Sequence, residues 1–114
     1  MPLRICLPEG KPYSFFRKYL LRPRRAPLPA GNLAERVRCV ALKVAAVFGI
    51  DWAARVDLIH ESGTDRLCLL ECDVAPLIGA GSAFAASLET AGIGRGEQLR
   101  MLLTKAAAGD RSEI

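Results

Sequence analysis

The sequence lacks the features that mark membrane and secreted proteins. No apolar run is long enough to span a bilayer, and the first residues, Met1 to Arg4, have neither the apolar stretch nor the cleavage site of a signal peptide. A membrane is therefore not expected as a partner, and we predict a cytoplasmic protein.

Cysteine and histidine are too few and too scattered for a zinc site. The four cysteines, Cys6, Cys39, Cys68 and Cys72, contain no CxxC pair, and His60 is the only histidine. Zinc sites need closely spaced sulfur and nitrogen ligands. We expect the cysteines to be reduced thiols buried among apolar side chains.

What is present is the composition of a globular protein. Hydrophobic residues make up 51% and charged residues 25% of the 114 residues, which is enough for one packed domain. That length is short for an enzyme that must hold a nucleotide and two substrates. We expect the chain to be a piece of something larger or to depend on another part.

Positive charge is concentrated between residues 17 and 38, within a net charge of +4. Such a cluster attracts phosphate on nucleotides, nucleic acids or membranes, and it can equally be a solvated basic face. No recognised nucleic-acid-binding module accompanies it, so nucleic acid is not favoured as a partner.

The spacing of apolar residues predicts an α+β fold, an antiparallel sheet with packed helices. The expected elements are, in order, a strand at 3–7, a long loop at 12–29, a helix at 32–48, a hairpin of strands at 52–59 and 66–72, a short helix at 82–92 and a last helix at 96–107.

Capping signals define the ends of these helices. Asn32 with Glu35 matches a capping box, and Gly49 suits the left-handed position that follows a helix. Ser82 is expected to cap the short helix, which then ends at Gly92.

Four charged residues fall on one face of the expected hairpin. If the turn is centred near Thr64, partners across the two strands have numbers that sum to about 128, which pairs Asp57 with Glu71 and Arg55 with Asp73. Strand alternation then places all four side chains on the same face. This prediction depends on the register, because a slip of one residue would break it.

Opposed carboxylates repel, so a positive group is expected between them. Oxygen-only ligands suit Mg²⁺ or Mn²⁺ beside nucleotide phosphates, with Asp57, Glu71 and Asp73 as the ligands. Arg55 would then stand beside the metal and neutralise negative charge that develops on a phosphate or an intermediate. The alternative is an exposed sheet face with an ordinary ion pair between Arg55 and Asp73.

Three further residues are ambiguous when each is taken alone. Ser82, at a helix N-terminus, can bind a carboxylate or a phosphate, or it can simply cap the helix. Lys18 can bind phosphate, and Tyr19 can simply pack; neither residue is decisive alone.

Taken in order, these motifs resemble the C-terminal part of ATP-grasp ligases, the D-alanine-D-alanine ligases in particular, from Pro2 to about Lys105. The family's loop pattern Tyr-x-Tyr-Glu-x-Lys-Tyr is similar to residues 13–19. Its Arg-x-Asp is similar to residues 55–57, and its Leu-Glu-x-Asn to residues 70–73.

The resemblance implies ATP-dependent ligation of a carboxylate to an amine through an acyl phosphate. The residues that it implies for this chemistry are the magnesium ligands Asp57, Glu71 and Asp73, the catalytic residues Arg55 and Ser82, and Lys18 with Tyr19 on the loop that closes over ATP. The arginine would stabilise the tetrahedral intermediate, and the serine would contact the carboxylate of the second amino acid.

On this interpretation the chain is a single partial domain. Its expected parts are a strand and closing loop at 1–31, a helix at 32–49, a metal-binding hairpin at 52–73, an acceptor loop with two helices at 74–108, and a tail at 109–114.

The sequence also departs from the family pattern. Asp73 stands where the family has asparagine, Phe16 where it has glutamate, and Leu77 where it has glycine. A different amino acid or a peptide-like acceptor therefore stays open as the substrate.

The family's adenine-binding hinge, phosphate-binding lysines and N-terminal substrate domain have no counterpart in these residues. We expect ATP and small amino acids as ligands only when the nucleotide-binding half is supplied, and no turnover by the chain alone. The alternative is a non-enzymatic module, derived from a truncated ligase, that self-associates or binds a protein through uncovered faces.

Overall fold

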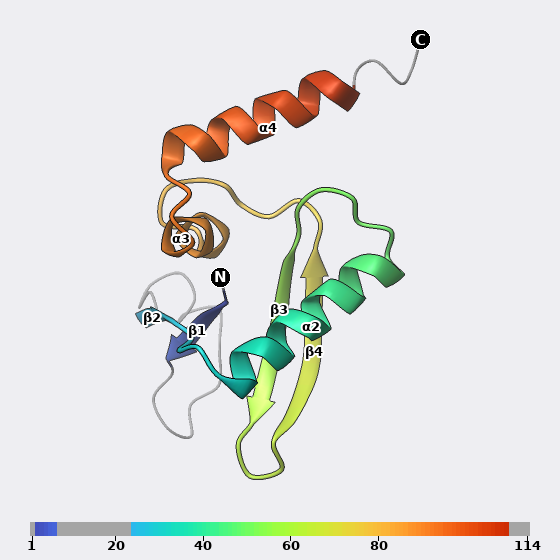
Figure 1. The fold of residues 1–114 in the computed structure, drawn as a ribbon, viewed down its shortest axis with the longest axis vertical. Helices are drawn as coiled ribbons and strands as arrows, with labels where there is room; N and C mark the ends of the chain where they lie inside the picture. The colour runs from blue at the N-terminus through green and yellow to red at the C-terminus, as the bar shows by residue number, and fades with distance from the viewer. Residues whose placement is uncertain (1, 7–23, 110–114) are drawn as a thin grey trace.

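The computed structural model describes residues 2–6 and 24–109, which form two two-stranded antiparallel sheets and three helices (Figure 1). The elements are β1 (Leu3–Cys6), β2 (Arg24–Pro27), α2 (Asn32–Val47), β3 (Arg55–Glu61), β4 (Arg66–Asp73), α3 (Ala83–Thr90) and α4 (Arg95–Gly109). The α+β class and the order of the main elements agree with the sequence prediction.

The first sheet joins β1 to a strand that the sequence did not predict. β2 pairs antiparallel with β1, with Leu3 opposite Pro27 and Cys6 opposite Arg24. The expectation of a loop through residue 29 is therefore wrong over β2. Its sequence Arg-Arg-Ala-Pro has no alternation of apolar and polar residues, so the pairing comes from the partner strand and not from a local pattern.

Helix α2 begins at the predicted residue and ends one residue before the predicted end, but its N-cap differs. Gly31 is the N-cap, with φ 153°, and no side chain caps the helix, so the predicted capping box at Asn32 is wrong. A φ of that value favours glycine, and the helix begins at Asn32 itself. The predicted left-handed glycine is confirmed: Gly49 has φ 62°, and Ile50 N–H donates to the Ala45 carbonyl at 2.9 Å.

The second sheet is the predicted hairpin of β3 and β4. Arg55 lies opposite Asp73 and Asp57 opposite Glu71, as predicted. The register shifts by one residue between Asp57 and Leu58, so that Leu58 lies opposite Leu69 and Leu70 is the extra residue of a β-bulge.

Helix α2 lies across this hairpin and is tied to its turn (Figure 1). Arg36 of α2 donates from Nη1 to Asp65 Oδ2 and from Nη2 to the Asp65 carbonyl, both at 2.6 Å. His60 Nε2 lies 2.8 Å from Asp65 Oδ1. One aspartate therefore fixes the turn to both the helix and the strand before it.

Helices α3 and α4 pack against each other through a buried glutamine. Gln98, on α4, is 5% exposed and donates from Nε2 to the carbonyls of Ala85 at 3.3 Å and Ile93 at 2.9 Å. Arg95 donates to Gln98 Oε1 at 3.0 Å. This polar network sets the angle between the two helices.

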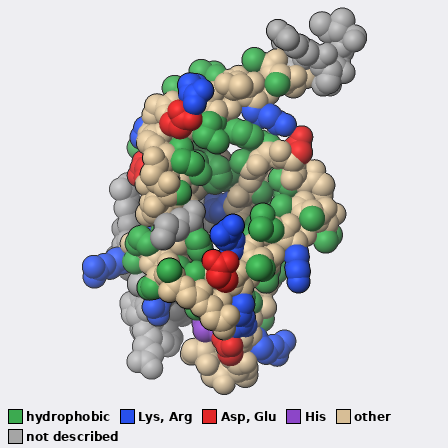
Figure 2. Space-filling view, in the orientation of Figure 1, with side chains coloured by type: hydrophobic (Ala, Val, Ile, Leu, Met, Phe, Trp, Pro, Cys, Tyr) green, Lys and Arg blue, Asp and Glu red, His purple; other side chains and the backbone are tan. Residues whose placement is uncertain are grey.

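The described residues bury very little. Ala85 is the only buried hydrophobic residue among them, and large apolar side chains are exposed on α2, on α4 and on the hairpin. Figure 2 shows apolar side chains on the visible face and a hollow between α4 and the hairpin. The expectation of buried cysteines is wrong for Cys39 and Cys68, which are exposed free thiols, and Cys72 is half-buried.

Among the described residues, no helix combines the length and the apolar character needed to cross a bilayer.

Candidate functional site

The candidate site is built at the open end of the β3–β4 hairpin, away from its turn. Alternation along each strand places Arg55 and Asp57 of β3 on the same face as Glu71 and Asp73 of β4. The strand pairing is regular from Arg55 to Asp57, so Arg55 lies directly opposite Asp73 and Asp57 directly opposite Glu71. The predicted register is therefore confirmed for all four residues.

The guanidinium of Arg55 lies between the three carboxylates. Arg55 Nε donates to Asp57 Oδ1 at 3.0 Å, and Nη2 donates to Glu71 Oε1 at 2.5 Å. Arg55 Nη1 lies 3.5 Å from Asp73 Oδ2. The ion pair between Arg55 and Asp73, which was the alternative to a metal site, is thus present, but it is the longest of the three contacts of Arg55.

The Arg55 side chain is less exposed to solvent than the carboxylates that it contacts. The Arg55 side chain is 20% exposed, whereas that of Glu71 is 55% exposed. Burial of the guanidinium acts to lower its pKa, but the hydrogen bonds and charges of Asp57, Glu71 and Asp73 outweigh burial and raise the Arg55 pKa. Arg55 is a cation, as arginine always is in proteins, and the three carboxylates stabilise its charge in this position.

The donor set has the chemistry of a site for a hard divalent cation. Three carboxylates and one guanidinium carry a net charge of −2, and all candidate ligand atoms are oxygens. Among the described residues, however, no group of three or more histidine, cysteine, aspartate or glutamate side chains is placed so that it could hold a metal ion. The residue types suit Mg²⁺ or Mn²⁺, but their arrangement does not form a metal site, so metal ligation stays a prediction.

Asp73 has a second role in the backbone. Its Oδ1 accepts a hydrogen bond from the Ala75 N–H at 3.0 Å, which closes a turn as the chain leaves β4. The family asparagine could make the same turn, so the aspartate adds charge to the site without changing the local backbone.

Ser82 performs the capping role that the sequence predicted. Its Oγ accepts from the Ala85 N–H at 3.1 Å at the start of α3, and Gly92, with φ 84°, follows the end of that helix. No hydrogen bond between described residues joins Ser82 to the acidic group. A substrate contact for Ser82 therefore stays a prediction.

The remaining candidate residues, Lys18 and Tyr19, lie outside the described residues. The loop pattern at 13–19 and Phe16 lie there as well.

Sequence analysis missed a contact that anchors the start of α3. Arg25 of β2 donates from Nη1 to the Gly81 carbonyl at 2.6 Å, which ties the first sheet to the residue before Ser82. Gly81 has φ 77°, a left-handed conformation that exposes its carbonyl to the arginine. Arg25 and Gly81 are 56 residues apart in the chain, and no local sequence pattern indicates a contact at that separation.

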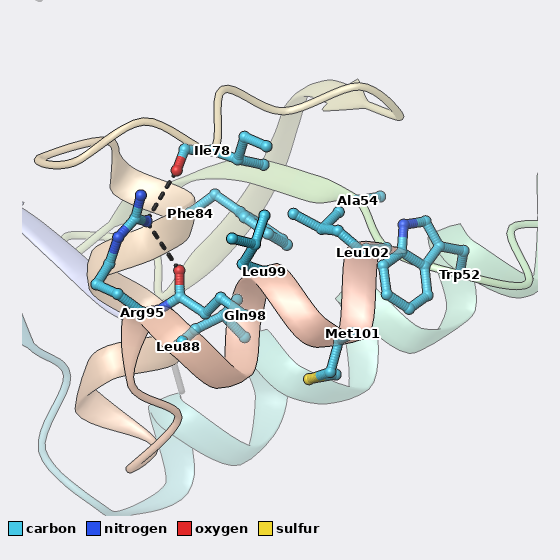
Figure 3. A pocket seen from close by; sticks show the side chains of 12 residues that line it. Trp52, Ala54, Ile78, Phe84, Leu88, Arg95, Gln98, Leu99, Met101 and Leu102 are labelled. Atoms are coloured by element: carbon cyan, nitrogen blue, oxygen red, sulfur yellow. Dashed lines mark hydrogen bonds between the residues drawn. The ribbon is translucent and has the colours of Figure 1, made fainter. Parts of the chain in front are cut away.

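No sequence pattern indicated the apolar pocket, whose lining includes Ala54 but none of the four residues of the acidic group. This cavity of about 540 Å³ lies between α4, α3 and the segment before β3, and Trp52, Phe84 and Leu99 line it (Figure 3). The polar side chains at its edge bond within the protein, because Arg95 donates to the Ile78 carbonyl at 2.8 Å and to Gln98. It therefore presents mainly apolar surface.

Comparison with known proteins finds similarity to one class of enzyme, a ligase. The chain is 33% identical over 100 residues to the D-alanine–D-alanine ligase of Chlorobaculum tepidum and 30% identical over 100 residues to that of Chlorobaculum parvum. Each alignment covers 85% of this chain. The ligase resemblance predicted from the motifs is thereby confirmed.

The similarity is to part of those enzymes only. The chain spans 28% of the length of each of these relatives. No family model matches the chain, and no solved structure matches it significantly.

Proposed function

We propose that this chain supplies the metal- and acceptor-binding part of an ATP-dependent carboxylate-amine ligase similar to D-alanine–D-alanine ligase, and that it corresponds to the C-terminal portion of an ATP-grasp fold. The observation that carries the proposal is the cross-strand pairing of Asp57 with Glu71 beside Arg55 and Asp73. The similarity to the two ligases supports it.

The hairpin, residues 52–73, is the proposed metal-binding segment. Asp57, Glu71 and Asp73 would hold Mg²⁺ or Mn²⁺, because oxygen ligands on a rigid two-strand frame suit these ions. When bound, the ion would offset the negative charge of ATP phosphates. Arg55, which is already a permanent cation at this place, would stabilise charge that develops on the reacting carboxyl group.

Residues 74–108 are the proposed acceptor-binding segment. Ser82 and the free N–H groups at the start of α3 form an anion-binding end, to which the carboxylate of an amino acid or peptide-like acceptor would bind. Lys18 and Tyr19 are proposed to lie on the loop that closes over ATP.

The proposal assigns nucleotide binding to a part of the ligase beyond this sequence. Since the chain spans 28% of its relatives, ATP and the amino-acid substrates would bind productively only with that part present. A ligase of this kind would work in the cytoplasm, where ATP is supplied.

Metal titration tests the proposal on the chain as it exists. We expect Asp57→Asn and Glu71→Gln each to weaken Mn²⁺ binding about tenfold in isothermal titration, because each substitution removes one charged ligand. Both amides keep the size and shape of the side chain, so the strand pairing is retained.

Glu97→Gln is the matched control. Glu97 is also a surface carboxylate paired with an arginine, Arg100, but it lies on α4. Its loss is expected to leave the Mn²⁺ affinity unchanged. Equal affinities in the wild type, Asp57→Asn and Glu71→Gln would contradict the proposed metal site.

The exposed apolar surface favours a second candidate function, a non-enzymatic module that associates with a second copy of itself. The described residues of the hairpin form a two-stranded sheet, which is marginal in water unless further strands or helices extend it. Two copies related by a twofold axis can pair equivalent edges and form four strands. Leu70 of β4, which is 60% exposed, would lie at the paired edge if β4 is the strand that pairs.

A further inference from the structure

Strand β4 is the more open edge of the hairpin. Among the described residues, β3 is the only strand that pairs with it. Five of the eight residues of β4 are exposed, against three of the seven residues of β3. Figure 1 shows the first sheet on the β3 side of the hairpin. A free strand edge offers its N–H and C=O groups to a further strand, so β4 is the edge at which a strand can be added.

The sequence of β4 is complementary to itself in an antiparallel pair. When residues 66–73 of two copies overlap along their whole length, the first residue of one strand lies opposite the last residue of the other. This register places Arg66 opposite Asp73 of the second copy at both ends, and Leu69 opposite Leu70 of the second copy at the centre. Opposite charges and apolar side chains that face each other across two strands both favour pairing.

The bulge in β4 allows this register in a twofold pair. Glu61 of β3 lies opposite Arg66, and Arg55 of β3 lies opposite Asp73. Glu61 and Arg55 are an even number of positions apart and share a face, so Arg66 and Asp73 share that face too. They are an odd number of positions apart, and in a regular strand they would point to opposite faces. The extra residue at the bulge therefore brings the two charges to one face.

Both charges are available for a contact between copies. Arg66 is exposed, and no ion pair between described residues includes it. The Asp73 side chain is 34% exposed, and its 3.5 Å contact with Arg55 is the longest that this arginine makes. Arg66 of a second copy can therefore bond to Asp73 without breaking a short contact.

We propose that this chain forms a twofold dimer in which the two β4 strands pair antiparallel along their whole length. The two hairpins then form one four-stranded sheet in the order β3–β4–β4–β3, a size at which a sheet is stable in water. Leu69 and Leu70, which are 46% and 60% exposed in the single chain, lie at its centre. This proposal rests on self-association, the second candidate function, and assigns its interface and register.

Charge reversal tests the pairing of Arg66 with Asp73. In a dimer of Arg66→Asp, two aspartates face each other at both ends of the paired strands, and in a dimer of Asp73→Arg, two arginines do. We expect each variant to dimerise about tenfold more weakly than the wild type in analytical ultracentrifugation at low salt. An equimolar mixture of the two should regain about the wild-type affinity, because each mixed dimer again pairs aspartate with arginine at both ends.

Arg100→Asp, which reverses an exposed arginine on α4, is the control and should dimerise like the wild type. A mixture that dimerises no better than its two components would overturn the proposal. Wild-type dimers that neither reversal weakens would overturn this interface and leave self-association standing. A wild-type chain that is monomeric at all concentrations would overturn both.

Cross-linking tests the register with both charges intact. In the proposed pairing Cys68, an exposed free thiol, lies opposite Glu71 of the second copy. Opposed residues of antiparallel strands have Cα atoms about 4.5–5.5 Å apart, a separation that a disulfide can span. With oxidised glutathione as the oxidant, we expect Glu71→Cys to give a covalent dimer on a non-reducing gel, and the further substitution Cys68→Ser to abolish it.

Leu69→Cys is the control for the register. In the proposed pairing it lies opposite Leu70 of the second copy, whereas a strand displaced by two residues would bring it opposite Cys68. We therefore expect much less covalent dimer from Leu69→Cys than from Glu71→Cys. A yield from Leu69→Cys that equals or exceeds that from Glu71→Cys would overturn the proposed register.

Discussion

Asp65 shows how one residue can hold a turn together. It has φ 54°, a conformation that few residues other than glycine adopt, and its side chain bonds both Arg36 and His60. Those contacts compensate for an unfavourable backbone. The hydrogen bond of Arg36 and then that of His60, with a smaller effect of their charges, lower the Asp65 pKa.

This pKa shift predicts a dependence of stability on pH. Because the folded-state pKa of Asp65 is lowered, its ionised form stabilises the fold above the ordinary carboxyl pKa of about 3.9. That contribution is lost as the pH falls through the lowered folded-state value. We expect Asp65→Asn to lower the thermal unfolding midpoint at pH 7, and the gap to close towards pH 3.

Asparagine is the appropriate replacement because it also tolerates positive φ and keeps an oxygen acceptor for Arg36. The measurement is a series of melting curves, followed by circular dichroism, from pH 7 to pH 3. Wild type and variant curves that remain parallel over that range would contradict the assigned role of the Asp65 charge.

At the scale of elements, Gln98 links α3 and α4. Both amide hydrogens and the amide oxygen are used within the protein, which is unusual for a single side chain on a surface helix. We expect Gln98→Ala to destabilise the packing of α3 on α4 by about 1–3 kcal/mol, because it removes the hydrogen bonds of a buried amide to the Ala85 and Ile93 carbonyls.

Trp52 provides the readout for this prediction. It is the only tryptophan and lines the pocket beneath α4 (Figure 3), so its fluorescence in urea reports on the separation of that helix. Gln98→Glu keeps the acceptor for Arg95 but loses both donors, and it should give a partial loss of stability. An unchanged urea midpoint in Gln98→Ala would contradict a structural role for the network.

Local patterns in the sequence predicted the main elements and the acidic pairing. The spacing of α2 and the turn-forming residues between β3 and β4 are strong signals, and they brought Asp57 opposite Glu71. Strand β2 was not predicted because its sequence has no alternation of apolar and polar residues. The bulge was missed because Leu67 to Leu70 are nearly all apolar and give no pattern that fixes the register.

The predicted site was incomplete for a different reason. Register specifies which residues share a face, but the position of the Arg55 guanidinium depends on a long side chain choosing among three partners. The Arg25–Gly81 and Gln98 contacts join residues from separate elements. No spacing rule within one element can predict such contacts.

For the whole molecule, the exposed apolar surface predicts self-association. We expect the apparent mass in analytical ultracentrifugation to rise with concentration from 12.3 kDa towards twice that value. Leu70→Lys, in β4, should shift this equilibrium towards the monomer by placing a charge at the paired edge.

Leu103→Lys is the control for this prediction. Leu103 lies on α4 and is 63% exposed, close to the 60% of Leu70, so it tests whether any loss of exposed apolar surface has the same effect. A strict monomer at all concentrations would contradict the self-associating module. Equal effects of the two substitutions would contradict the hairpin as its interface.

The bulge at Leu70 has a consequence for how this hairpin tolerates change. If the ladder from the turn continued without it, Asp57 would face Leu70, and Glu71 would point to the opposite side of the sheet. One extra residue thus brings the two carboxylates level. The hairpin therefore has one register on each side of the bulge. A change in the length of the turn can be absorbed between the turn and the bulge, while the pairing of the acidic residues is kept.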